Sequence, residues 1–108
     1  MGILLGNGDG TFQPEKRYSA GKFPLNVVVA DFDGDGKQDV AMANNQGNNL
    51  SVFFGNGDGT FQPHIDYPTG TQPFTLAVGD FNGDGAPDLA VTNFADDTVG
   101  VLLNNGSR

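Results

Sequence analysis

Short apolar runs follow one another along the chain, separated by segments rich in glycine, asparagine and aspartate. The runs are rich in β-branched and aromatic residues, and no stretch has the 3.6-residue periodicity of an amphipathic helix. Runs of this length between turn-forming residues predict strands. The clearest of them are residues 27–30, 40–43, 50–54, 76–78, 89–92 and 99–103. The pattern predicts an all-β protein.

The sequence repeats itself with an offset of 49 residues. The nonapeptide at 6–14 returns unchanged at 55–63, and the dipeptide at 31–32 returns at 80–81. Four types of strand recur in each unit, and repeats of about 40–50 residues with four antiparallel strands are typical of β-propeller blades. The predicted fold class is therefore a β-propeller with about two blades in residues 1–108. A β-sandwich is the alternative, although a sandwich does not require a repeat.

The acidic residues are concentrated in two windows, 31–39 and 80–88. Thirteen acidic and five basic residues give a net charge of −8, and seven of the acidic residues lie in these windows. The charge argues against nucleic acid or an anionic membrane as partner, and no apolar run approaches the roughly 18 residues of a membrane span. Because clustered carboxylates repel one another without a cation, the windows indicate metal sites.

Each window places oxygen donors at alternate positions of a glycine-rich loop. Such a loop can curl around a hard cation, and an all-oxygen donor set favours Ca²⁺ over Zn²⁺ or copper. The loops are not EF-hands, because Met42 and Val91 stand where an EF-hand has its bidentate Glu. We expect about two Ca²⁺ per chain, with an acidic turn without an ion as the alternative. The predicted ligands are the side chains of Asp31, Asp33, Asp35, Asp39, Asp80, Asn82, Asp84 and Asp88, and the backbone carbonyls of Lys37 and Ala86.

Other candidate sites are weaker. The segment 6–10 and its copy at 55–59 predict hairpin turns, since no helix follows that could bind a phosphate. The chain has one histidine, His64, and no cysteine, so no nucleophile–base pair can be assembled. The clustered carboxylates are better explained as metal ligands than as the acid pair of a glycosidase. We expect a protein without catalytic activity.

The acidic windows resemble a known repeat. Asp-Phe-Asp/Asn-Gly-Asp-Gly-x-x-Asp, followed by Val/Leu-Ala, is similar to the FG-GAP/VCBS repeat of integrin-like β-propellers, and residues 4–13 resemble the bacterial members. The resemblance implies a calcium loop between two neighbouring strands of a blade, with the same ten ligands. It also implies an extracellular or cell-surface module for binding or adhesion, with a propeller lectin that binds glycans between its blades as the alternative.

The number of blades differs from that of these relatives, which close a ring of about six to eight blades. In this chain the blade at 26–67 is complete, whereas the blade at 75–103 lacks its fourth strand. The strand at 11–18, from a neighbouring chain, can supply it. We therefore expect a cyclic homo-oligomer, a trimer rather than a tetramer, in which strands 3–5 and 101–103 compete for one place. Met1 falls in the middle of a unit, which favours a piece of a longer propeller or a designed unit.

Overall fold

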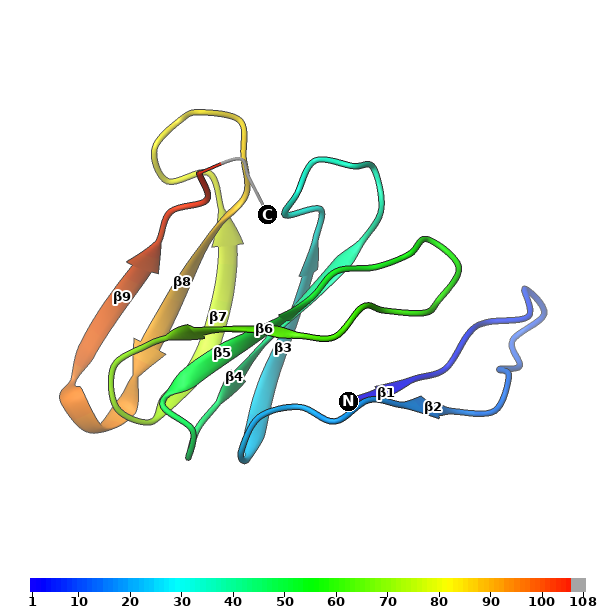
Figure 1. Cartoon of the computed structure of the whole chain (residues 1–108), viewed down its shortest axis with the longest axis horizontal. Coiled ribbons are helices and arrows are strands. Elements are labelled where there is room, and N and C mark those ends of the chain that lie inside the picture. Colours follow the sequence, from blue (N-terminus) through cyan, green and yellow to red (C-terminus); the bar gives the residue numbers. More distant parts are fainter. Residues whose placement is uncertain (106–108) are drawn as a thin grey trace.

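Antiparallel strands are the main regular secondary structure of the computed structural model, which describes residues 1–105 (Figure 1). Within these residues the only helical element is the 3-10 turn η1 (Phe94–Asp96), and none of their helices is long enough to cross a membrane. The predicted all-β fold class is confirmed. The strands are β1 (Gly2–Ile3), β2 (Lys16–Arg17), β3 (Pro24–Ala30), β4 (Asp39–Asn44), β5 (Asn49–Phe53), β6 (Ile65–Pro68), β7 (Pro73–Gly79), β8 (Asp88–Asn93) and β9 (Thr98–Leu102).

The strands form three sheets, each an antiparallel meander. Blade 1 has the order β3-β4-β5-β6, blade 2 has β7-β8-β9, and β1 and β2 form the N-terminal hairpin. The register of blade 2 repeats that of blade 1, since Val28 pairs with Ala41 in blade 1 and their counterparts 49 residues later, Ala77 and Ala90, pair in blade 2. These sheets are consistent with propeller blades. Completion of blade 2 by another chain stays a prediction, because β2 pairs here with β1 of its own chain.

Blade 1 is covered on both faces, which explains the continuous apolar runs of β4 and β5. One face packs against blade 2 and buries the larger core, made of Phe32, Ala41, Ala43, Leu50, Val52, Phe54, Leu76, Leu89 and Val91. The opposite face packs against the N-terminal hairpin and the loop before β6. Its smaller core consists of Val40, Met42 and Phe53, with Met1, Tyr18, Ala20 and Phe61 partly buried against them.

Asparagine side chains of blade 1 connect it to blade 2. Oδ1 of Asn26 accepts a hydrogen bond from the backbone N–H of Leu76 at 3.0 Å, so β3 and β7, the first strands of the two blades, are joined directly. Oδ1 of Asn48 accepts one from the N–H of Gln72, also at 3.0 Å. These directional bonds fix how the two apolar faces are placed on each other.

The predicted hairpin turns at 6–10 and 55–59 are confirmed. In the first, the N–H of Asn7 donates to the carbonyl of Thr11 at 2.9 Å, and Oδ1 of Asp9 accepts from the N–H of Thr11 at 3.0 Å. The fourth strand of blade 1 begins later than expected, since the copy of the strand expected at 11–18 would start at residue 60. Phe61 makes an isolated bridge to Gly55 as part of the turn, and regular pairing resumes only at Ile65.

We predict that Leu50→Ala lowers the free energy of unfolding by about 2–5 kcal/mol, because Leu50 is fully buried between the blades and the truncation leaves a cavity. Urea unfolding followed by circular dichroism measures the change. Leu25→Ala is the matched control, since Leu25 is exposed on β3 and should change stability by at most about 0.5 kcal/mol. Equal losses in the two variants would contradict the assignment of the core.

Candidate metal centre

Two acidic loops lie at the same end of the two blades (Figure 1). The first joins β3 to β4 and the second joins β7 to β8, so each connects the first two strands of its blade. Each loop ends in an aspartate, Asp39 or Asp88, that is also the first residue of the next strand. The second loop is the copy of the first at the 49-residue offset.

The carboxylates of each loop converge. Asp31, Asp33, Asp35 and Asp39 each offer an oxygen, and these four oxygens all lie within 4.8 Å of one another. In the second loop Asp80, Asp84 and Asp88 do the same. The structure therefore gathers all seven aspartates that the sequence analysis selected, although they span nine residues in each loop.

The other three predicted ligands lie on the same loops. Asn82 stands where the first loop has Asp33, and it leaves the second loop with one charge fewer. The backbone N–H groups of Lys37 and Ala86 donate to Asp35 Oδ1 and Asp84 Oδ1 at 2.9 and 3.0 Å. These bonds place both residues at the site, while coordination by their carbonyls stays a prediction.

Backbone amides hold the first carboxylate of each loop in place. Asp31 Oδ1 accepts hydrogen bonds from the N–H groups of Gly34 at 2.9 Å and Asp35 at 3.2 Å, and its Oδ2 accepts one from Gly36 at 2.8 Å. Gly34 and Gly36 have φ angles of 74° and 83°, a left-handed conformation that favours glycine. Asp80 is held in the same way by the amides of residues 83–85.

The last carboxylate of each loop has a structural role that the sequence did not reveal. Asp39 is fully buried, and its Oδ2 and Oδ1 accept the N–H groups of Phe32 at 2.9 Å and Gly55 at 2.8 Å. Asp88 accepts those of Phe81 at 2.9 Å and Asn104 at 2.7 Å. Each of these aspartates thus ties its loop to the chain that follows the third strand. The only sign of this role in the sequence is that an acidic residue stands at the start of an apolar strand.

The electrostatics of the first loop fit a cation. The N–H of Gly36 and further backbone amides lower the pKa of Asp31, so this carboxylate is ionised at neutral pH. Partial burial raises the pKa of Asp33, and its contacts with Asp35 and the charge of Asp39 raise it further. A divalent cation among these oxygens would relieve this repulsion. The all-oxygen donor set fits Ca²⁺.

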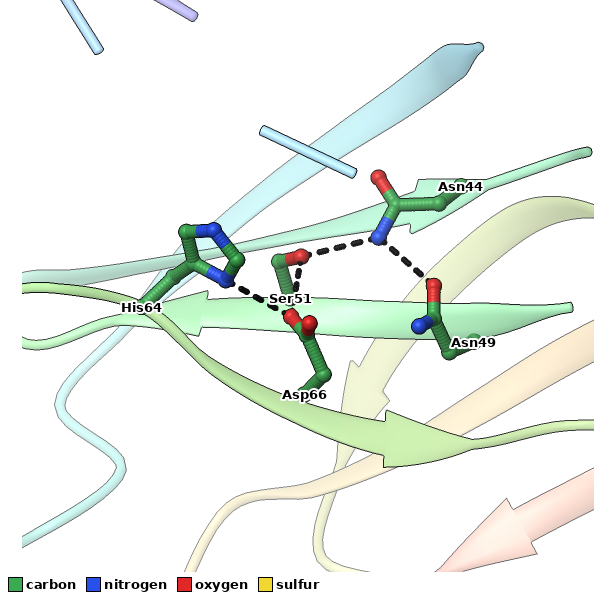
Figure 2. Close-up of polar contacts among 5 residues, drawn as sticks. All are labelled: Asn44, Asn49, Ser51, His64 and Asp66. Carbon is green, nitrogen blue, oxygen red and sulfur yellow. Dashed lines mark hydrogen bonds and ion pairs between the residues drawn. The ribbon is translucent and has the colours of Figure 1, made fainter. Parts of the chain in front are cut away.

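A second polar cluster, on blade 1, contains a serine, a histidine and an aspartate (Figure 2). Asp66 Oδ1 accepts a hydrogen bond from Ser51 Oγ at 2.6 Å and lies 2.7 Å from His64 Nδ1. Asn44 Nδ2 donates to Ser51 Oγ at 2.8 Å and to Asn49 Oδ1 at 2.9 Å. The carboxylate lies between the hydroxyl and the imidazole, so His64 is not placed to activate the buried Ser51, as a catalytic triad requires. The cluster connects β4, β5 and β6.

We predict that Asp39→Ala destabilises the protein even in the presence of a chelator. The substitution leaves the buried amides of Phe32 and Gly55 without an acceptor, at a cost of about 1–3 kcal/mol each. Asp35→Ala is the control, because Asp35 is exposed and should cost at most about 1 kcal/mol under the same conditions. Thermal unfolding with EDTA distinguishes the two. If the variants lose equal stability, Asp39 does not have this structural role.

Comparison with known proteins supports the family resemblance. The model of the FG-GAP-like repeat matches the chain twice, over residues 1–42 and 31–91. No curated protein and no solved structure matches the chain significantly. The two matches include both hairpin turns, the whole first acidic loop and the second loop with the first residues of β8. The chain belongs to the family of FG-GAP-like repeats.

Proposed function

We propose that the chain is a calcium-binding β-propeller module with a binding rather than a catalytic role. The observation that carries this proposal is the convergence of four carboxylate oxygens within 4.8 Å in the first acidic loop, repeated with three in the second. Like charges so close together lower stability unless a cation neutralises them. Membership of a repeat family that forms β-propellers supports the same role.

Each loop supplies the ligands of one Ca²⁺. In the first loop these are Asp31, Asp33, Asp35 and Asp39, with the carbonyl of Lys37. In the second loop they are Asp80, Asn82, Asp84 and Asp88, with the carbonyl of Ala86. When bound, the ion supplies positive charge and fixes the loop. Since Asp39 also accepts N–H groups from Phe32 and Gly55, calcium at the first loop stabilises the junction of three segments of blade 1.

The module acts outside the cell or on its surface, where millimolar calcium can fill sites of about 10⁻⁴–10⁻³ M affinity. Its ligand is a protein or a glycan. Two tyrosines could stack on a sugar. Tyr18 is partly buried, with its ring 5.6 Å from that of Phe61, whereas Tyr67 is 36% exposed. The partial burial of Tyr18 supports a protein ligand rather than a glycan. Binding to a glycan array would instead support the lectin alternative.

We predict that calcium raises the melting temperature, because it binds the folded chain and not the unfolded one. At ten times the dissociation constant, two sites give a rise on the order of 10 °C. Differential scanning calorimetry with calcium and with EDTA measures it. Asp35→Ala should reduce the rise and Asp9→Ala should not, because Asp9 caps a hairpin turn outside the acidic loops. An unchanged melting temperature in EDTA, with no calcium heat in titration calorimetry, would refute the metal site.

We also predict that the two sites differ in their response to pH. The raised pKa of Asp33 means that this ligand binds a proton at a higher pH than an ordinary aspartate does, whereas Asn82 in the second loop does not titrate. The first site should bind calcium more tightly at neutral pH and lose affinity at a higher pH than the second. Asp33→Asn should make the first site behave like the second, and Asn82→Asp should do the reverse. Calorimetric titrations at pH 7 and at about pH 5 test this, and identical pH profiles in all three proteins would contradict it.

A further inference from the structure

An apolar cleft of about 490 Å³ lies between the outer strands of the two blades. Tyr67 of blade 1 lines one side, and Leu102, Leu103 and Asn104 of blade 2 line the other, with Phe54 among the remaining residues. Within the described residues, blade 2 has no fourth strand beside β9. The cleft therefore opens at the edge where blade 2 is one strand short.

The equivalent position on the opposite face of blade 1, next to the N-terminal hairpin, is occupied by aromatic side chains. There the ring of Tyr18 lies 5.6 Å from Phe61 at an interplanar angle of 85°, and 6.4 Å from Phe53. At the 49-residue offset, Tyr18 corresponds to Tyr67 and Phe53 to Leu102, and both of these line the cleft. No described residue stands at the counterpart of Phe61. Among the described residues, therefore, no aromatic ring contacts Tyr67 in the cleft as Phe61 contacts Tyr18.

The chain itself carries an equivalent aromatic side chain, Phe12, in an exposed position. Phe12 occupies in the N-terminal hairpin the place that Phe61 occupies in blade 1, within an identical nonapeptide. It bridges Gly6 as Phe61 bridges Gly55. Yet its exposed fraction is 64%, and among the described residues no aromatic ring contacts it as Tyr18 contacts Phe61.

Two apolar surfaces next to these positions are also uncovered. On the outer face of blade 2, Val99 and Val101 are 67% and 53% exposed, whereas their counterparts Leu50 and Val52 are buried against blade 2. On β3 of blade 1, Val27 and Val29 are 55% and 57% exposed. The counterpart of Val27 is Leu76, which is buried against blade 1. The chain therefore exposes two surfaces, one on β9 and one on β3. The counterparts of these surfaces pack together in the interface between its own blades.

We propose that a second copy of the chain completes blade 2. Its strand β2 adds beside β9, and its Phe12 enters the cleft against Tyr67. The outer face of blade 2 then packs on blade 1 of that copy, where it covers Val27 and Val29. Both halves of this contact already exist inside one chain, as the packing of blade 1 on blade 2 and of Phe61 on Tyr18. The second copy is therefore favoured over an unrelated partner.

The register of the added strand follows from blade 1. Leu50 pairs with Tyr67 and Val52 with Ile65 there, so Val99 should face Tyr18 of the second copy and Val101 should face Lys16. Strand β9 keeps its place, because it pairs with β8 over five residue pairs, whereas β1 pairs with β2 over only two. Strand β1 of the second copy therefore gives way.

The contact is head-to-tail, so each copy both donates and receives a strand, and a ring closes when the rotation per chain permits. We expect three chains and six blades, within the four to eight blades of known propellers. The inference does not depend on the proposed calcium function, because no metal ligand takes part in the contact.

Cross-linking between engineered cysteines tests the contact directly, since the natural chain has no cysteine. The double variant Phe12→Cys with Tyr67→Cys, treated with a short bismaleimide, should give covalent dimers and trimers on a denaturing gel. The matched control is Tyr18→Cys with Phe61→Cys, which places the equivalent pair within one chain and should give a cross-linked monomer. If the first variant yields only monomer while the control reacts, the proposal is wrong.

The mass in solution provides the second test. Light scattering should give three times the 11.3 kDa of one chain; two or four chains with the same cross-link would also support the contact. Phe12→Asp should return the mass to one chain, and Phe12→Tyr should not. Since Phe12 is exposed in its own chain, circular dichroism should show that both variants fold. A folded natural chain of 11.3 kDa, or an oligomer unaffected by Phe12→Asp, would overturn the proposal.

Discussion

The carboxylate of Asp39 is fully buried, and each of its oxygens accepts a backbone N–H from a different segment of the chain. A buried charge is tolerated only where hydrogen bonds or an opposite charge compensate it. The two amides provide part of this compensation, and the sheet must therefore bring Phe32 and Gly55 to the same carboxylate. The acidic loop and the start of the hairpin turn after β5 are thus held by one group.

The same arrangement recurs in blade 2 with a different donor. Asp88 accepts the N–H of Asn104 where Asp39 accepts that of Gly55. The Asn104 side chain then donates from Nδ2 to the carbonyl of Phe32 at 2.6 Å and to that of Pro87 at 3.1 Å. A side chain at the end of blade 2 therefore contacts the acidic loop of blade 1. Gly55, at the equivalent position of blade 1, has no side chain that could make such contacts.

Much of the fold could be predicted from the sequence because its signals are local. Apolar runs between glycine-rich turns identify the strands, and the alternate carboxylates of a loop such as 31–39 identify the site. The double role of Asp39 could not be predicted. One of its carboxylate oxygens accepts the backbone N–H of Gly55, sixteen residues away, and only the folded sheet brings the two groups together. The late start of β6 at Ile65 has a similar cause, since the bridge between Gly55 and Phe61 extends the turn into the segment in which the strand was expected.

Asn104 links the proposed metal site to the surface proposed to receive a second copy. It lines the cleft on the side opposite Tyr67, and its backbone N–H donates a hydrogen bond to Asp88, a predicted ligand of the second loop. A cation that fixes Asp88 also fixes Asn104, and so holds the edge of blade 2 in the position that an added strand requires. By the reciprocity of linked equilibria, a strand docked there should in turn favour the ordered form of the loop. The proposed calcium binding and the proposed assembly, although they use different residues, therefore act on the same end of blade 2.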